Sequence, residues 1–175
     1  MTTLQVSRPA PSFKGLALIG REFKPIALED YRGKWVALLF YPMDFTFVCP
    51  TELVGLNDKH DEFKARNCVV LAASTDSVYS HLGWVKADAR LGDLKYPLLS
   101  DLTKQIAHSY GVLLEDQGVA LRGTFLIDPE GVLRWASVND LNTGRSIDEI
   151  LRVLDACETG ELCPANWKKG EATLS

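Results

Sequence analysis

The chain has 175 residues, of which 46% are hydrophobic and 24% are charged, and this is the composition of a globular domain that buries a core without disulfide staples. A formal net charge of -4 argues against a partner such as nucleic acid or an anionic membrane. No apolar run approaches the roughly 18 residues that cross a bilayer, and no cationic start precedes an apolar segment, so we expect a cytoplasmic protein.

The first half of the chain predicts a strand, a helix and a second strand. Apolar runs at 35–40 and 69–73 are typical of strands buried on both faces. The segment 50–67 between them places Leu53 and Leu56 on one helical face, so it predicts one amphipathic helix. This order of elements indicates a right-handed parallel crossover.

The second half predicts shorter elements that complete a mixed sheet. They are a helix capped by Ser77, a strand at 96–101, a short helix ended by Gly111, a hairpin with its turn at 128–131, and a final helix with a capping box at Ser146 and Glu149. The order is similar to that of a thioredoxin-like α/β fold with additional N-terminal strands and helices flanking the sheet. We expect one domain over residues 1–160, followed by a C-terminal tail at 161–175.

The four cysteines are Cys49, Cys68, Cys157 and Cys163. They are too few for a disulfide scaffold, and they form neither a C-x-x-C pair nor a cluster with the histidines that would suit a metal ion. In a reducing compartment, where structural disulfides are rare, cysteines that have a function are commonly catalytic or redox-sensing. The cysteine pattern therefore favours chemistry over a structural role.

Cys49 lies where the strand at 35–40 leads into the predicted helix. Pro50 is favoured in a first helical turn, so Cys49 is expected at the helix N-terminus, where free N–H groups and the helix dipole stabilise a thiolate. Packing is the commoner fate of a cysteine, but this position favours a nucleophile. Thiolate formation by itself accelerates a thiol only about twofold, because nucleophilicity falls as the thiolate becomes more stable. Other groups must therefore orient the electrophile and stabilise its leaving oxygen.

Three residues are candidates for that assistance. Thr46 offers a hydroxyl three residues before Cys49, Arg122 offers a cation at the start of a hairpin strand, and Pro42 could shield the thiolate from water. Each also has a simpler interpretation: Thr46 caps a turn, Arg122 lies on a solvated face and Pro42 ends a strand. Residue type alone favours the simpler interpretation in each case.

Several segments resemble one known family. FYPMDFTFVCPTEL at 40–53 resembles the active-site signature of the peroxiredoxins, and CPANWKKGEATL at 163–174 resembles the resolving-cysteine segment of their typical two-cysteine branch. RGTFLIDPEG at 122–131 and NTGRSIDEILR at 142–152 are also similar to that family. The resemblance runs from about residue 5 to the C-terminus.

The resemblance implies an antioxidant thiol peroxidase that reduces hydrogen peroxide and organic hydroperoxides to water and alcohols. Cys49 would attack the peroxide and become a sulfenic acid. Around it, the resemblance assigns peroxide binding to Thr46, stabilisation of the thiolate and transition state to Arg122, shielding to Pro42, and a supporting charged network to Glu52 and Arg145.

A sulfenic acid needs a second thiol, because without one it can over-oxidise irreversibly. Cys68 opens a buried run and Cys157 continues the apolar stripe of the last helix, so both predict packing roles. Cys163 lies in the polar tail, and this placement and the resemblance both favour it as the resolving cysteine. The resemblance further implies that the disulfide joins two subunits of a homodimer, and that such dimers assemble into a decamer.

The source of electrons and the branch of the family follow from other features. Since no flavin motif or phosphate-binding loop is present, we expect no cofactor and no metal, and electrons would come from thioredoxin or from a flavoprotein disulfide reductase. Residues 89–92 stand where the oxidation-sensitive branch carries Gly-Gly-Leu-Gly, and the chain ends without that branch's Tyr-Phe helix. The resemblance is therefore to the alkyl hydroperoxide reductase C-subunit branch, and it implies resistance to over-oxidation.

Two other functions remain open. A redox-switched chaperone or a peroxide sensor would use the same cysteines for rearrangement rather than turnover. A thiol hydrolase would need a general-base histidine near Cys49, and the sequence places none next to it.

Overall fold

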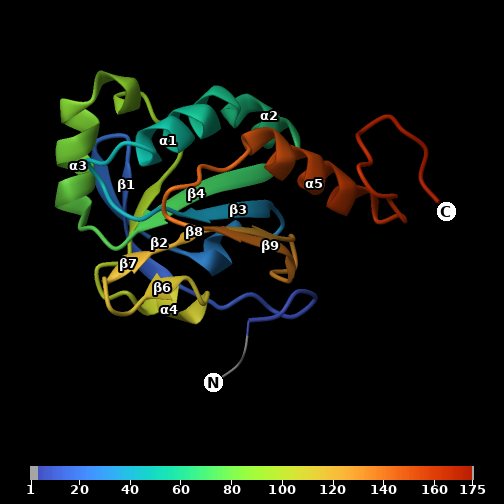
Figure 1. Ribbon diagram of the computed structural model, residues 1–175, viewed down its shortest axis with the longest axis horizontal. Coiled ribbons are helices and arrows are strands. Elements are labelled where there is room, and N and C mark those ends of the chain that lie inside the picture. The colour runs from blue at the N-terminus through green and yellow to red at the C-terminus, as the bar shows by residue number, and fades with distance from the viewer. Residues whose placement is uncertain (1–3, 175) are drawn as a thin grey trace.

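The computed structural model describes residues 4–174, and its centre is a seven-stranded mixed sheet (Figure 1). The strand order is β2-β1-β5-β4-β3-β8-β9. These strands are β1 (Lys14–Ile19), β2 (Glu22–Ala27), β3 (Trp35–Phe40), β4 (Cys68–Ser74), β5 (Leu98–Ser100), β8 (Arg122–Ile127) and β9 (Leu133–Asn139). A separate two-stranded sheet consists of β6 (Leu113–Leu114) and β7 (Val119–Ala120).

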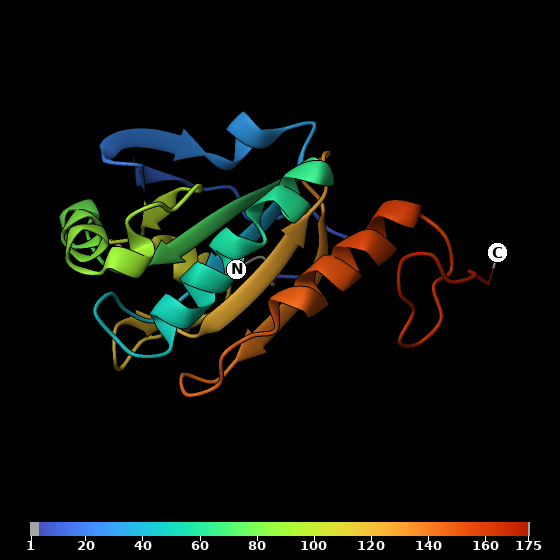
Figure 2. The same cartoon turned by 90° about the horizontal axis from the view of Figure 1, so that it is seen from above.

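Helices cover both faces of the sheet unequally. They are α1 (Cys49–Asp58), α2 (His60–Ala65), α3 (Val78–Ala87), α4 (Gln105–Ser109) and α5 (Ile147–Thr159), with short 3-10 helices η1 (Leu28–Tyr31) and η2 (Ala89–Leu91). Side chains of α1, α2, α3 and α5 pack into one core cluster, whereas α4 and η1 contribute to the other (Figures 1 and 2). In the part of the chain that the structure describes, none of the helices is long and apolar enough to cross a membrane.

The predicted crossover is confirmed, but its helix is divided. β3 and β4 are parallel, with Trp35 beside Cys68. The sequence predicts one helix over 50–67, which is wrong in detail, because α1 ends at Asp58 and α2 begins at His60. Lys59 between them has φ -93° and ψ 5°, outside the helical range. The preceding Asn57 and Asp58 are weak helix formers, and this favours the break.

The predicted hairpin and the start of the final helix are confirmed. The carboxylate of Asp128 accepts hydrogen bonds from the backbone N–H groups of Glu130 and Val132, which fixes the turn between β8 and β9. Ser146 caps α5 by accepting the N–H of Glu149. The reciprocal half of the capping box is absent from the described helix end, because the Glu149 side chain pairs with Arg152 instead.

Strand register decides where the functional residues meet. β8 is antiparallel to β3, and Leu39 lies opposite Thr124. The start of β8 therefore lies at the carboxyl end of β3, where the loop at 41–48 leads into α1. This is the edge where open α/β sheets usually carry their sites.

Candidate active site

Cys49 is the first residue of α1 and its thiol is completely buried. Pro50 follows in the first turn, as the sequence predicts. Among residues 4–174, no side chain caps this end of the helix, and Cys49, as its first residue, belongs to the turn that carries the positive end of the helix dipole. This position suits a negatively charged sulfur if the neighbouring side chains are positively charged.

Arg122 supplies a cation directly beside that sulfur. Its Nη1 donates to Cys49 Sγ at 3.4 Å and to Glu52 Oε2 at 2.8 Å, and its Nε donates to the carbonyl of Leu141 at 2.8 Å. The residue is 3% exposed. The simpler interpretation of Arg122 as part of a solvated face is therefore wrong, because the strand register turns this side chain into the site.

Glu52 and Arg145 hold the Arg122 guanidinium in place. Arg145 donates to Glu52 Oε1 through Nε at 2.9 Å and through its backbone N–H at 3.0 Å, and to Oε2 through Nη2 at 2.8 Å. Burial tends to raise the pKa of Glu52, but the hydrogen bonds and charges of Arg145 and Arg122 outweigh it, so this pKa lies below its ordinary value. Two buried cations and one carboxylate leave one positive charge, which a thiolate at Cys49 would neutralise.

Thr46 and Pro42 lie in the loop between β3 and α1. Thr46 Oγ1 donates to the carbonyl of Met43 at 2.9 Å, so the hydroxyl caps a turn, and the residue is partly exposed. Pro42 is buried, two residues after the end of β3 at Phe40. Both simpler interpretations thus describe this structure, and the roles of Thr46 and Pro42 toward a peroxide stay predictions.

A buried polar network that sequence reasoning missed anchors the same loop. The Tyr41 hydroxyl donates to Asp44 Oδ1 at 2.7 Å, Asp44 Oδ2 lies 2.8 Å from His81 Nδ1, and the Asp44 N–H donates to Asp76 Oδ2 at 2.9 Å. Burial raises the pKa of Tyr41 well above its ordinary value, and the charge of Asp44 adds to this rise. The available signal was Asp44 itself, a charged residue between Pro42 and Thr46.

The remaining cysteines differ in accessibility. Cys68 is 5% exposed, and burial raises its pKa to about 12. Cys163 is half-buried beyond α5, with its Sγ 3.4 Å from Thr159 Oγ1. In both ribbon views, the N-terminal end of α1 lies far from the C-terminal end of α5 (Figures 1 and 2). Within one chain, Cys163 therefore does not face Cys49.

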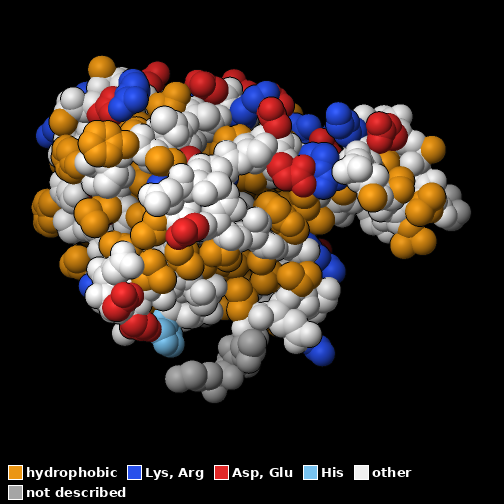
Figure 3. Space-filling view, in the orientation of Figure 1, with side chains coloured by type: hydrophobic (Ala, Val, Ile, Leu, Met, Phe, Trp, Pro, Cys, Tyr) orange, Lys and Arg blue, Asp and Glu red, His pale blue; other side chains and the backbone are white. Residues whose placement is uncertain are grey.

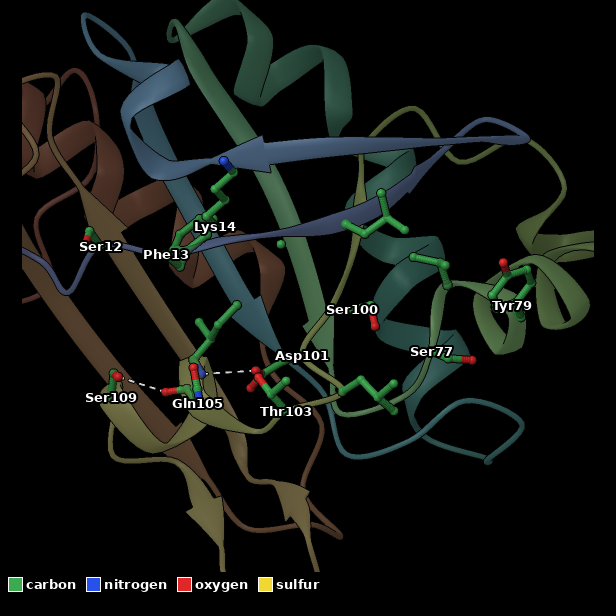
Figure 4. Close-up of a pocket in the computed structure, with 15 residues that line it drawn as sticks. Ser12, Phe13, Lys14, Ser77, Tyr79, Ser100, Asp101, Thr103, Gln105 and Ser109 are labelled. Carbon is green, nitrogen blue, oxygen red and sulfur yellow. Dashed lines mark hydrogen bonds between the residues drawn. The ribbon is translucent and has the colours of Figure 1, made fainter.

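A separate cavity of about 520 Å³ lies between β1, α3 and α4 (Figure 4). Its lining includes Lys14, Tyr79, Asp101 and Gln105. Asp101 accepts hydrogen bonds from two backbone N–H groups of α4, so its carboxylate is already satisfied. Residues 4–174 contain no group of three or more His, Cys, Asp or Glu side chains that could hold a metal ion.

Comparison with known proteins identifies similar sequences and structures. The model of the AhpC/TSA family matches residues 6–136, and the model of the C-terminal domain of 1-Cys peroxiredoxin matches residues 156–175. Thioredoxin peroxidase of Fasciola hepatica is 53% identical over 178 residues, which cover 98% of this chain and 92% of that protein. The human mitochondrial thioredoxin-dependent peroxide reductase is 53% identical over 176 residues, or 97% of this chain and 69% of that protein.

Solved structures agree with these sequence relatives. Reduced 2-Cys peroxiredoxin from Plasmodium vivax has a TM-score of 0.93 and 44% identity, covering 97% of this chain and 92% of that one. AhpC from Enterococcus faecalis has a TM-score of 0.88 and 36% identity, covering 91% of this chain and 98% of that one.

Proposed function

The chain belongs to the AhpC/TSA family of peroxiredoxins and is a thiol-dependent peroxidase, and we propose that Cys49 is its peroxide-reducing nucleophile. The observation that carries this proposal is the buried Cys49 sulfur at the N-terminus of α1, 3.4 Å from Arg122 Nη1. The thiolate attacks one oxygen of a hydroperoxide and the O–O bond breaks. The other oxygen leaves as water or an alcohol after protonation, and Cys49 becomes a sulfenic acid.

The charged residues act on the transition state of this step. Negative charge moves from the sulfur toward the leaving oxygen, and the Arg122 guanidinium stabilises it at both positions. Glu52 and Arg145 keep that guanidinium oriented through the hydrogen bonds between them. Thr46 would orient the bound peroxide, and Pro42 would keep water from the thiolate.

Cys163 of a second subunit is the proposed resolving thiol. Its sulfur attacks the Cys49 sulfenic acid, water leaves, and an intersubunit disulfide forms. Because Cys49 is completely buried, the first turn of α1 has to open before the two sulfurs meet. The distance between the N-terminal end of α1 and the tail within one chain supports a donor from another subunit. Residues 1–160 would then be the peroxidase domain, and 161–175 the tail that carries the resolving cysteine.

Thioredoxin is the proposed electron donor, with a flavoprotein disulfide reductase as the alternative. Supporting this, relatives at 53% identity are named thioredoxin peroxidase and thioredoxin-dependent peroxide reductase. Such a donor reduces the disulfide by thiol–disulfide exchange, which needs no cofactor bound to this chain.

A decamer built from dimers is the proposed assembly. Several large hydrophobic side chains are exposed, and Phe47 is 94% exposed. Phe45 lies against Trp84 of α3. Tyr79 of α3 and Leu102 line the cavity between β1, α3 and α4. Figure 3 shows exposed hydrophobic side chains at several places along the α3 edge of the molecule, and a larger group over the centre of the same face. Burial of this surface between dimers would remove an unfavourable exposed apolar patch.

A cytoplasmic location belongs to the same proposal. All four cysteines are free thiols, which suits a reducing compartment. Relatives from Drosophila melanogaster and human are named as mitochondrial proteins. Cell fractionation of the endogenous protein tests the proposal, and recovery in the mitochondrial fraction would contradict it.

A redox-switched chaperone or peroxide sensor is the second candidate, and the exposed Phe45 and Phe47 side chains favour it. Its requirement is a change of assembly or binding upon oxidation of Cys49. Protection of a heat-denatured client that depends on peroxide but not on continuous reductant would support it.

Steady-state peroxide consumption tests the enzyme directly. Wild type, Cys49→Ser and Cys163→Ser are compared with thioredoxin, its reductase and NADPH, and then with dithiothreitol. Wild type turns over with both, Cys49→Ser with neither, and Cys163→Ser only with dithiothreitol, because a small thiol can resolve the sulfenic acid directly. Full activity of Cys49→Ser would overturn the proposal.

A further inference from the structure

Two cysteines, Cys157 and Cys163, lie at the end of α5 and just beyond it, and the proposed reaction uses only Cys163. Cys157 lies in the last turn of α5, half-buried against the core. After Thr159 the helix ends, and Gly160, in the left-handed conformation with φ 65°, turns the chain back. Cys163 Sγ then lies 3.8 Å from the carbonyl oxygen of Ala156. That carbonyl belongs to the peptide group joining Ala156 to Cys157, so the Cys163 sulfur lies beside the backbone of the helical turn that carries Cys157.

We propose that Cys157 is a third redox cysteine, which takes over the disulfide that Cys163 forms with Cys49 of the partner subunit. The inference rests on the proposed function, since that reaction supplies the disulfide. Cys157 loses its proton to solvent, and its thiolate attacks the Cys163 sulfur. The bond from Cys163 to the partner's Cys49 breaks, a bond between Cys157 and Cys163 forms, and the partner's Cys49 leaves as a thiolate. One disulfide exists before and after the step, so it needs no additional oxidant or reductant.

The surroundings of the three sulfurs favour this direction of exchange. Thiol–disulfide exchange is faster when the departing thiolate is stabilised, and Cys49 departs toward the Arg122 guanidinium and the N-terminus of α1. Burial raises the pKa of Cys157; the charges of Cys163 and Glu158 raise it further, and Arg134 on β9 lowers it. The raised pKa leaves less Cys157 as thiolate near neutral pH, but the thiolate that does form is the stronger nucleophile, so the exchange should become faster as the pH rises.

Contacts of the tail keep Cys163 close to Cys157 on its own chain. Arg152 Nη1 of α5 donates to the carbonyl of Trp167 at 2.9 Å, and Lys169 Nζ lies 3.2 Å from Asp155 Oδ1. Trp167 itself is 3% exposed. After exchange, this docking holds the new disulfide on the tail, while α1 of the partner subunit can refold around its reduced cysteine.

Peptide mapping tests the exchange. Reduced wild type receives one equivalent of hydrogen peroxide without reductant, and samples are quenched with acid and an alkylating agent. Cys157 and Cys163 share one tryptic peptide, residues 153–168, because no Lys or Arg lies between them. An internal disulfide leaves this peptide unalkylated and lighter by two hydrogen atoms. When the peptide is cut further after Glu158 and Glu161, the disulfide still joins the fragment that contains Cys157 to the fragment that contains Cys163. We expect this species to replace the intersubunit link over time, about tenfold faster per pH unit below the pKa of Cys157.

Three variants make the outcome decisive. Cys157→Ser should accumulate only the link between Cys49 and Cys163, and Cys68→Ala should behave as wild type because Cys68 is buried elsewhere. Cys49→Ser should form no internal disulfide at the same peroxide dose. If wild type keeps Cys157 fully alkylated while Cys157→Ser forms the intersubunit link, the exchange is refuted and the proposed function stands. An internal disulfide in Cys49→Ser would show that peroxide oxidises Cys157 and Cys163 directly, and it would refute the exchange. Loss of the intersubunit link in Cys157→Ser would refute the proposed resolution step.

Discussion

Replacement of Arg122 by methionine removes the cation that contacts both Cys49 and Glu52, at 3.4 Å and 2.8 Å. A unit charge 3.4 Å from a thiolate is worth about 5 kcal/mol at an effective dielectric constant of about 20. Glu52 cancels part of this, so we expect a net loss of about 2–4 kcal/mol, comparable to removal of one oxyanion-hole donor. Peroxide reduction should therefore slow about 30- to 1,000-fold.

The rate constant of reduced enzyme with hydrogen peroxide is measured by competition with a haem peroxidase, so that no electron donor is involved. Arg122→Lys is the matched control, because it keeps the charge but loses the planar fork that reaches the Leu141 carbonyl and Glu52 together. Its rate should lie between the other two. Circular dichroism verifies folding. A folded methionine variant with the wild-type rate constant would refute the electrostatic role of Arg122.

Further predictions concern stability, assembly and reactivity. In the folded protein the pKa of Glu52 lies below its ordinary value of 4.5. The charge of Glu52 therefore stabilises the fold above pH 4.5, and this stabilisation disappears as the pH falls through the folded pKa. The free energy of unfolding, measured with urea from about pH 3 to 5, should depend less on pH in Glu52→Gln than in wild type. Phe47→Asp should abolish species larger than the dimer in sedimentation velocity, and an intact decamer would contradict the proposed surface. In native protein, iodoacetamide should label Cys163 and spare Cys68, whose pKa is about 12; labelling of Cys68 first would contradict its burial. Mass spectrometry should find little sulfinic acid at Cys49 after modest peroxide with reductant present, and abundant sulfinic acid would contradict the expected robustness.

Much of the fold could be predicted because its signals are local. The apolar runs of β3 and β4 and the Ser146 cap of α5 each depend on a few adjacent residues, and the structure confirms all three. The break at Lys59 was missed, because an amphipathic stripe continues across it and the weak helix propensity of Asn57 and Asp58 competes with that stripe.

The site was less predictable, because it depends on strand register. Residue type favoured a solvated Arg122, and only the antiparallel pairing of β8 with β3 turns it toward Cys49. Resemblance, not residue pattern, pointed to Glu52 and Arg145, which the structure joins through three hydrogen bonds. The contact between Asp44 and His81 joins a loop to α3 over 37 positions, and no local signal encodes such a pairing.

The central claim is that Cys49 of one subunit reacts with peroxide and is resolved by Cys163 of another. Cys49→Ser and Cys163→Ser chains, both in a Cys157→Ser background, are mixed under conditions that exchange subunits and are then treated with peroxide. Each variant alone should give only monomer on a non-reducing gel, whereas the mixture should give a disulfide-linked dimer, because a heterodimer contains one complete site. The account would be contradicted if the mixture gave no such dimer while the Cys157→Ser protein, which keeps both Cys49 and Cys163, formed a disulfide between these two cysteines within one chain.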